Sequence, residues 1–361
     1  MKTMHSTVVQ LKERSYEILT GTGIFPDVVL GHSVVRECRS RILVIADSKL
    51  KAAGRRLAAK LGSRCAGVVL MKGGEKSKHI GTLMKLYAAA VRARLDRKSV
   101  VVAMGGGVAG DVSGFFAGTY LRGIKIVHVA TTVIAQVDSA IGGKTGIDLP
   151  QAKNLVGVFH QPSLVVSDVN LLKTLPKREF RAGLAEVIKY GVIADALMFE
   201  RLERRLNRIL EQDPAELQWM IQRCAAIKAR VVSWDERETK GLRAMLNFGH
   251  TIGHGIEAAS HFNLLHGEAV ALGMIGASRL SVKLSGLSGV DAIRIFDLIM
   301  KCGLPVRMPA NIRRHAALAA MKLDKKAVAG QLRFVLVSRI GQARTDIPVD
   351  EAFCRLAVGD L

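Results

Sequence analysis

The sequence predicts an α/β protein of two domains, in which a mostly parallel sheet is followed by an all-helical C-terminal half. The chain has 361 residues, which exceeds the usual size of one domain. Short β-branched runs alternate with helical patterns in its first half, whereas long amphipathic patterns with few strand signals fill the second. We place the boundary near Pro176, so that the domains comprise residues 1–176 and 177–361.

Continuous apolar runs mark the expected strands. They lie at residues 41–47, 66–71, 99–104, 124–130 and 163–168. Strands of this kind, separated by helices, indicate a parallel sheet that is covered on both faces, as in nucleotide-binding proteins. In the second half, residues 198–212 and 217–232 have the amphipathic pattern of long helices, and residues 331–341 are expected to form a small hairpin or an edge strand.

The composition excludes several classes of protein. The formal net charge is +22, but the charge is scattered and aromatic residues make up only 5%, which argues against a nucleic-acid-binding protein. The 5 cysteines are widely spaced without a C-x-x-C pair, which favours a reducing cytoplasm over a disulfide framework. The N-terminus lacks the apolar core of a signal peptide, and no apolar run is long enough for a membrane span, so we expect a soluble protein.

A glycine-rich loop follows the run at 99–104. Gly105, Gly107 and Gly110 match G-x-G-x-x-G between a strand and a helix, where backbone N–H groups can approach a pyrophosphate. The alternative is a tight turn without a ligand. No carboxylate stands about 20 residues later, where the usual fingerprint has one, so Asp47 is the better candidate for the adenosine ribose. A helix N-cap is the alternative role for Asp47.

The stretch "SAIGGKTG" at 139–146 resembles a phosphate loop, but Asp138 stands where the Walker pattern needs glycine. The sequence therefore argues against an NTPase. What remains is Lys144 with Lys153 and Asn154 nearby, a set of side chains suited to an anionic group of a substrate.

The helical half holds a carboxylate and three histidines in suggestive positions. Glu186 and Lys189 share a helical face, although a surface ion pair is an equally simple reading. His250 and His254 are four residues apart, and His266 follows within the same 17 positions. A carboxylate with imidazoles and no cysteine is typical of a catalytic zinc site with an open position. Residue 251 is threonine, so H-E-x-x-H is not met, and three histidines compete for two positions; core histidines are the alternative.

Several longer blocks, taken together, resemble the 3-dehydroquinate synthase family of sugar-phosphate cyclases. They are "GGGVAGDVSGFFAGTYLRG", "TTVIAQVDSAIGGKTGID", "AKNLVGVFHQP", "LKTLP", "GLAEVIKYG", "DERETKGLRAMLNFGHTIGH" and "LHGEAVALGM", in this order along the chain. The resemblance extends from "ERSYEILTGTGIF" to "LDKKAVAGQLRFVLVSRIG", which is most of the sequence.

The resemblance implies an NAD-binding α/β domain, a helical metal-binding domain, an active site between them, and a homodimer in the cytoplasm. It implies one divalent metal, zinc or cobalt, bound by Glu186, His250 and His266. His254 would then transfer protons rather than bind the metal. Arg122 would reach the phosphate site of the neighbouring subunit.

The activity implied is the conversion of 3-deoxy-D-arabino-heptulosonate 7-phosphate to 3-dehydroquinate and phosphate, a step of the shikimate pathway to aromatic amino acids. NAD would oxidise a hydroxyl transiently, which makes the neighbouring proton acidic and allows phosphate to leave. Reduction of the ketone would return NAD to its oxidised form, and an intramolecular aldol reaction would close the carbocycle.

The family motifs also assign residues. Catalytic roles are implied for Asp138, Lys144, Lys189 and His254. Substrate contacts are implied for Arg122, Asn154, Lys228, Arg243, Asn247, Lys325 and Lys326. NAD contacts are implied for Asp47, Gly73, Gly74, Glu75, Lys76, Ser77, Lys78, Gly107, Val108, Ala109, Gly110, Asp111, Thr131, Thr132, Lys144, Lys153, Leu171, Leu172, Lys173 and Thr174.

The chain departs from the family pattern at a few positions. Lys49, Gly73, Ala130 and Ala152 stand where the family often has Asn, Asp, Pro and Gly, and the first two bear on the adenosine site. The stretch around Glu238 is one residue longer than usual. The rivals to this assignment are a related cyclase acting on glucose 6-phosphate or sedoheptulose 7-phosphate, and a metal-dependent polyol dehydrogenase, which would accumulate NADH.

Overall fold

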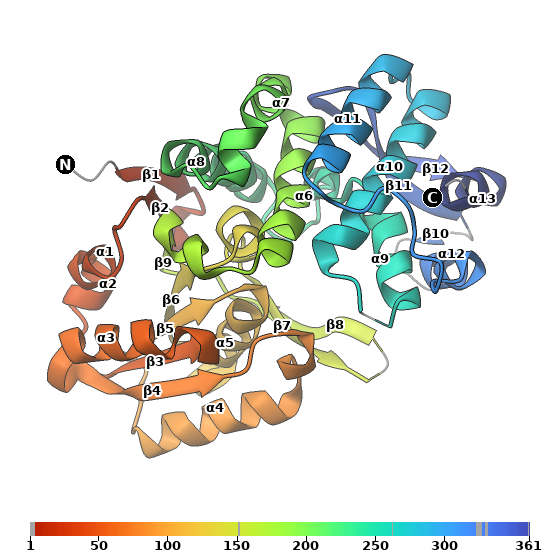
Figure 1. Ribbon diagram of the computed structural model, residues 1–361. Coiled ribbons are helices and arrows are strands. Elements are labelled where there is room, and N and C mark those ends of the chain that lie inside the picture. Colours follow the sequence, from red (N-terminus) through yellow and green to blue (C-terminus); the bar gives the residue numbers. More distant parts are fainter. Residues whose placement is uncertain (1–3, 151, 262, 323–326, 329–330, 360) are drawn as a thin grey trace. The chain divides into compact units, whose positions relative to one another are not determined.

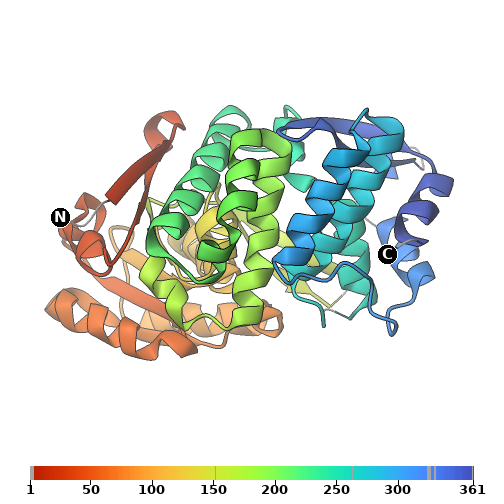
Figure 2. The ribbon, with the colours of Figure 1, turned by 45° about the horizontal axis from the view of Figure 1, so that its top comes forward.

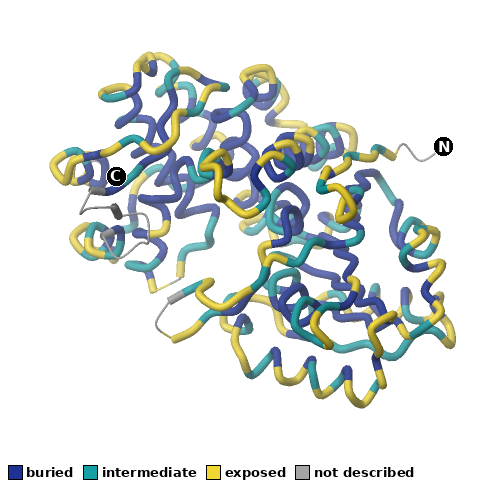
Figure 3. The backbone as a smooth tube through the Cα atoms, turned by 180° about the vertical axis from the view of Figure 1, so that it is seen from behind, coloured by how far each residue is buried: buried dark blue, intermediate teal, exposed yellow. Residues whose placement is uncertain are grey.

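The computed structural model describes residues 4–150, 152–261, 263–322, 327–328, 331–359 and 361. The chain forms two compact units. Unit 1 contains the residues up to Leu175 together with Leu217–Arg237, and unit 2 contains Pro176–Glu216 and Glu238–Leu361. Buried segments run through the interior of each unit, with exposed segments outside them (Figure 3).

Unit 1 is built on a seven-stranded sheet in the order β1-β2-β9-β6-β5-β3-β4. The strands are β1 (Met4–Val9), β2 (Tyr16–Gly21), β3 (Ile42–Asp47), β4 (Cys65–Met71), β5 (Val100–Gly105), β6 (Lys125–Ala130) and β9 (Leu164–Asp168). Every neighbouring pair is parallel except β1 with β2. The five predicted strands are confirmed within one or two residues, and so is the mostly parallel sheet.

Helices cover both faces of this sheet (Figure 1). They are α1 (Asp27–Gly31), α2 (Ser33–Arg36), α3 (Lys51–Leu61), α4 (Ile80–Arg92) and α5 (Gly107–Thr119). Leu57 of α3 packs with Val44 and Val102 on one face, whereas Phe116 of α5 packs with Val101 on the other. The continuous apolar runs are explained by this arrangement, because alternate side chains of each strand are buried on opposite faces.

One helix that covers the sheet of unit 1 comes from far along the chain. Helix α8 (Pro214–Trp234) supplies Ala225, Ala229 and Val232, which pack with Ile18 and Val165 of the sheet. A boundary at residue 176 assigned this helix to the C-terminal half, whereas the structure packs most of it in unit 1. The pattern of an amphipathic helix shows that one face is buried but not which surface buries it.

Unit 2 is mainly helical, as predicted. Its helices are α6 (Lys177–Ala194), α7 (Ala196–Leu210), α9 (His250–Ala259), α10 (His266–Leu284), α11 (Gly289–Lys301), α12 (Arg314–Lys322) and α13 (Glu351–Gly359). Helix α10 packs against α6, α9 and α11 (Figure 2). The exception to an all-helical unit is a three-stranded sheet of β10 (Ala327–Val328), β11 (Gln331–Arg339) and β12 (Gln342–Val349). The expected hairpin at 331–341 corresponds to β11 and its turn into β12.

All 5 cysteines are free thiols. Within the described ranges, no helix is both long and apolar enough to cross a lipid bilayer.

One buried histidine makes unit 1 sensitive to acid. His128 of β6 is only 4% exposed. Burial, and to a smaller extent His160, lower the pKa of His128 from 6.5 to about 4. Between these values the unfolded chain binds more protons than the folded chain, so stability present at pH 7 is lost as the pH falls. The shift corresponds to about 3 kcal/mol.

We therefore expect His128→Gln to lose less stability than the wild type between pH 7 and pH 4. Denaturant unfolding at several pH values measures this difference. His315→Gln is the control, because His315 is exposed. Equal acid sensitivity of His128→Gln and the wild type would contradict the prediction.

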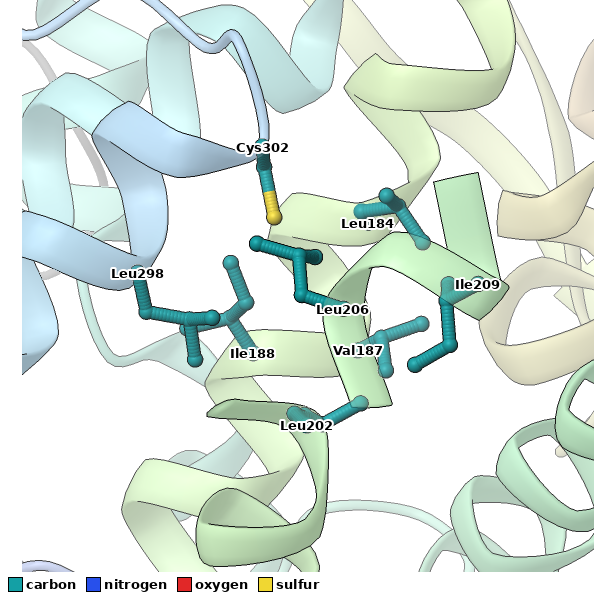
Figure 4. A pocket seen from close by; sticks show the side chains of 8 residues that line it. All are labelled: Leu184, Val187, Ile188, Leu202, Leu206, Ile209, Leu298 and Cys302. Carbon is teal, nitrogen blue, oxygen red and sulfur yellow. The ribbon is translucent and has the colours of Figure 1, made fainter. Parts of the chain in front are cut away.

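A small apolar cavity lies inside unit 2 between α6, α7 and α11 (Figure 4). It is lined by Leu184, Val187, Ile188, Leu202, Leu206, Ile209, Leu298 and Cys302. Burial raises the pKa of the Cys302 thiol to about 12, so this cysteine stays protonated and unreactive.

Leu206→Ala should enlarge this cavity and destabilise the protein by about 2–5 kcal/mol, because the surrounding helices cannot collapse fully into the space. Leu197→Ala on the same helix removes the same atoms from a residue that is 71% exposed. Denaturant unfolding should show a shift for the first variant and almost none for the second. Similar shifts would show that the site relaxes without a cavity.

Candidate functional site

In unit 1, the residues predicted to contact NAD gather at one edge of the parallel sheet. Asp47 ends β3, residues 73–78 follow β4, Gly105 ends β5, Thr131 and Thr132 follow β6, and residues 171–174 follow β9. The carboxyl ends of parallel strands meet at the same edge, which is where open α/β sheets bind ligands. The topology therefore brings together segments that are far apart in the sequence.

The glycine loop leads directly into α5. This helix begins at Gly107 with Gly106 as its N-cap, and no side chain caps it. The first N–H groups of a helix lack intrahelical partners, and the helix dipole favours negative charge there. The N-terminus of α5 is therefore chemically suited to a pyrophosphate.

Asp47 has the geometry of the N-cap alternative. Its Oδ1 accepts a hydrogen bond from the backbone N–H of Lys49, at 2.9 Å. A Cβ added at Gly73 would lie 2.3 Å from Oδ2 of Asp47, so the carboxylate occupies space that a side chain at residue 73 would need. Residue 73 is therefore a glycine because the Asp47 carboxylate fills the space that its side chain would occupy.

Lys78 is the centre of a polar network in unit 1. Its buried Nζ donates to Oδ2 of Asp111, at 2.6 Å, and to Oδ1 of Asn154. Burial opposes protonation of Lys78, but Asp111 raises its pKa above the ordinary value. Burial also raises the pKa of Asp111 to about 6. Nearby, Nζ of Lys153 lies 3.3 Å from Oε1 of Glu75.

The network connects the residues after β4 with a two-stranded hairpin of β7 (Lys144–Leu149) and β8 (Ala152–Phe159). Asn154 has a left-handed backbone, with φ of 55°, and its N–H donates to Asp148 at 2.9 Å. The two hydrogen bonds, one to the side chain and one from the backbone of Asn154, together hold its side-chain amide in position. Residues that the sequence analysis assigned to cofactor and to substrate are therefore neighbours.

Asp138 lies in a π-helical turn at Ala135–Ser139. The Nζ of Lys228, from α8, donates to Oδ1 of Asp138 at 2.7 Å and to its carbonyl oxygen at 2.6 Å. Lys228 is only 5% exposed. Short π-helical turns are often found at functional sites.

In unit 2, the buried Glu186 and His250 and the partly exposed His266 form a group with the geometry of a metal site. Oε1 of Glu186 lies 3.4 Å from Nε2 of His250 and 3.5 Å from Nε2 of His266. Glu186, on α6, is 1% exposed. The three ligand atoms of this group lie within 4.8 Å of one another, so one ion can contact all three.

The other ring nitrogens of these histidines face oxygen atoms. Nδ1 of His250 donates to the carbonyl oxygen of Phe248, at 3.2 Å. Nδ1 of His266 lies 3.4 Å from Oε2 of Glu257. Partners of this kind direct Nε2 toward the metal in known sites and fix the ring orientation. The donor set therefore fits a divalent cation such as zinc or cobalt.

The two histidines differ in charge. Burial first, and then the charge of Lys189, lower the pKa of His250 well below its ordinary value. For His266, burial is outweighed by hydrogen bonds to Glu186 and Glu257, which raise its pKa to about 10. A neutral imidazole is the form that binds metal, so His250 already has the form of a ligand, whereas His266 would have to lose a proton to become one.

His254 is on the same helix but is exposed. Its ring centroid lies 5.3 Å from that of His250 and 6.0 Å from that of His266. His254 also forms a second possible donor group with Glu257 and His266. The contacts of Glu186 favour His250 and His266 as the metal ligands. The ring distances place His254 beside this group, and its side chain is accessible to solvent.

Two of the predicted cationic residues, Lys189 and Arg243, are buried in unit 2. Lys189 is 1% exposed and forms an ion pair with Glu186, so the surface ion pair considered above is replaced by a buried one. Arg243 and Asn247 belong to a 3₁₀ helix at Leu242–Asn247. Arg243 is 3% exposed, and its Nε lies 3.7 Å from Oε1 of Glu238. The predicted Lys325 and Lys326 lie outside the described residues.

Glu257 is a functional candidate that the sequence pattern did not predict. Its spacing of three residues from His254 on a helix places both on one face, which is the signal that would have found it. The motif "LHGE" contains a second glutamate, Glu268, which accepts the backbone N–H of Leu265 at the start of α10.

Two solved structures cover nearly the whole chain. A 2-deoxy-scyllo-inosose synthase complexed with carbaglucose-6-phosphate, NAD+ and Co2+ is 27% identical, with a TM-score of 0.88 over 99% of each chain. A 2-epi-5-epi-valiolone synthase from Streptomyces hygroscopicus, with NAD+ and Zn2+ bound, is 27% identical, with a TM-score of 0.87 over 98% of each chain. The fold and the site thus define an enzyme of the NAD- and metal-dependent sugar-phosphate cyclase class.

The sequence comparisons are more specific. Residues 68–182 match the model for the N-terminal part of 3-dehydroquinate synthase, and residues 183–327 match that for its C-terminal part. A curated 3-dehydroquinate synthase of Pelobacter propionicus is 46% identical over 343 residues, which cover 94% of each chain. The chain belongs to the 3-dehydroquinate synthase family.

Proposed function

We propose that this protein converts 3-deoxy-D-arabino-heptulosonate 7-phosphate to 3-dehydroquinate and phosphate. The observation that carries the proposal is the donor group of Glu186, His250 and His266, in a chain of this family. A phosphorylated sugar acid carries several negative charges, and Lys189, Lys228 and Arg243 are buried cations suited to such a substrate.

Glu186, His250 and His266 would hold zinc or cobalt. When bound, the metal supplies a Lewis acid for a substrate hydroxyl, and NAD supplies a reversible hydride acceptor. Lys189 holds the Glu186 carboxylate in place through their ion pair. His254, accessible beside the group, moves a proton to or from the substrate.

In unit 1, the residues at the carboxyl edge of the sheet would bind NAD. The N–H groups at the start of α5 would bind its pyrophosphate, and Lys78 holds Asp111 and Asn154 in place. Asp47 remains our candidate for the adenosine ribose. Lys144 and Asp138 would act on the substrate together with Lys228, which orients the Asp138 carboxylate.

The proposal includes a homodimer in which Arg122 contributes to the neighbouring site. Arg122 is exposed and has a left-handed backbone, with φ of 66°. Leu121, beside it, is 40% exposed, and Leu155 and Phe159 of β8 are 41% and 44% exposed. Apolar side chains exposed on a strand are typical of surfaces that a second chain covers.

We also place the protein in the cytoplasm, where its free cysteines would remain reduced. The small-molecule substrate is the partner that the site requires. The basic residues of the protein would attract this anionic substrate, so the proposal includes no nucleic-acid or membrane partner.

The test is phosphate release from the heptulosonate phosphate, with and without NAD and a chelator. We expect release that needs both NAD and the metal, without net formation of NADH, because the hydride is returned. Accumulation of NADH would instead indicate a polyol dehydrogenase. Turnover of glucose 6-phosphate or sedoheptulose 7-phosphate in place of the heptulosonate would indicate a related cyclase.

A further inference from the structure

Three residues of α6, spaced four apart, face the first three residues of α10. The pairs are Arg178 with Glu268, Ala182 with Gly267, and Glu186 with His266. Residues four apart on a helix lie on one face. One stripe of α6 therefore contacts the whole first turn of α10, in which His266 is the first residue.

The outermost pair is a double hydrogen bond. Nε of Arg178 donates to Oε1 of Glu268 at 2.6 Å, and Nη2 donates to Oε2 at 2.7 Å. Oε2 also accepts the backbone N–H of Leu265 at 2.9 Å, the residue directly before His266. The Glu268 side chain is 12% exposed. A carboxylate with these three donors fixes both the side chain of Arg178 and the first turn of α10.

The middle pair sets the distance between the helices. A Cβ added at Gly267 would lie 1.8 Å from the carbonyl oxygen of Ala182. The two backbones are therefore in direct contact beside His266, with no side chain between them to absorb a shift. Any movement of the first turn of α10 changes the distance from Nε2 of His266 to Glu186.

We infer that Arg178 and Glu268 are positioning residues for the metal site. They hold His266 at its distance from Glu186 through the first turn of α10, and they contact neither metal nor substrate themselves. The inference rests on the proposed function, since it concerns the metal group assigned there. Loss of a partner behind a ligand typically weakens metal binding about 10–100-fold.

The chain offers a matched control in the same unit. Arg294 of α11 binds Glu203 of α7 in the same double manner, at 3.1 Å from Nε and 2.7 Å from Nη2. This pair has no contact with the donor group. Arg178→Met and Arg294→Met therefore each remove a double hydrogen bond to a glutamate, one behind His266 and one elsewhere, and Arg294→Met also removes a hydrogen bond to Asp291 at 3.0 Å.

The experiment measures Co2+ affinity by competition with a chelator, the visible absorption of bound Co2+, and the melting temperature of the metal-free protein. Arg178→Met and Glu268→Gln should bind Co2+ about 10–100-fold more weakly, with an altered spectrum. Arg294→Met should bind it like the wild type. Arg178→Lys should recover only part of the Co2+ affinity. Lysine keeps the positive charge, but its ammonium group cannot span both oxygens of the Glu268 carboxylate.

Wild-type affinity in Arg178→Met, or an equal loss in Arg294→Met, would overturn the inference. So would a melting temperature that falls much further in Arg178→Met and Arg178→Lys than in the control, since the pair would then serve folding alone. If Arg178→Met weakens Co2+ binding as expected but the wild type releases no phosphate, the proposed function fails while the inference stands.

Discussion

His250→Ala should lose both bound metal and phosphate release, whereas His254→Ala should keep the metal and lose turnover. His250 is 8% exposed, and its Nε2 lies 3.4 Å from Glu186, so its removal takes away one of three donors. The affinity should fall by more than the about 10–100-fold that follows loss of an outer partner. His254 is exposed, and loss of a general acid or base lowers kcat by about 10²–10⁴-fold.

Metal content after dialysis and phosphate release measure the two effects separately. His315→Ala is the control, since His315 is exposed on α12 and is no part of the donor group. Equal metal loss in the His250 and His254 variants would refute this division of roles. Loss of metal in His254→Ala alone would instead favour the group of His254, Glu257 and His266.

Lys78→Met should weaken NAD binding and lower the stability of unit 1 together. The ammonium group of Lys78 bonds to both Asp111 and Asn154, and Lys78 is 5% exposed. Removing one partner of a buried ion pair destabilises a protein by about 3–5 kcal/mol, because the other charge stays buried. The raised pKa of Asp111 should rise further, so that this residue loses its charge near neutral pH.

Titration with NAD and denaturant unfolding test this prediction. Lys72→Met is the matched control, because Lys72 is exposed directly after β4, is not among the predicted NAD contacts, and should change stability by no more than about 0.5 kcal/mol. Unchanged NAD affinity in Lys78→Met would remove Lys78 from the cofactor site. Unchanged stability would show that water replaces the ammonium group.

The strands that the sequence predicted are β3, β4, β5, β6 and β9, and all of them except β4 are central in the sheet. Residues such as Val101 and Val102 of β5 are buried on opposite faces, so the whole run is apolar and easily recognised. The sequence analysis missed β1, whose residues alternate between exposed and partly buried, and β7 with β8. These three strands lie at an edge or in a separate hairpin, where one side faces solvent and the apolar signal is weak. It also missed β2, which is largely buried between β1 and β9.

The metal group shows a different limit. Helical spacing places His250 and His254 on one face, and so it could not choose between them without the family motif. The choice in the structure depends on α6 and α10, which bring Glu186 to His250 and His266. Contacts of this kind join residues 64 or more positions apart, which no local pattern encodes. Arg178 was missed for the same reason, because its partner Glu268 lies 90 positions away, whereas Glu257 could have been found from its local spacing to His254.

The return of α8 to the sheet has a consequence for dissecting the gene. A truncated product ending near residue 176 would lack Ala225, Ala229 and Val232, and would leave Ile18 and Val165 facing water. Such a fragment should precipitate or require chaperones, and supplying residues 217–237 in trans should rescue it. The two halves of this coding sequence therefore cannot be shuffled as independent cassettes at that position.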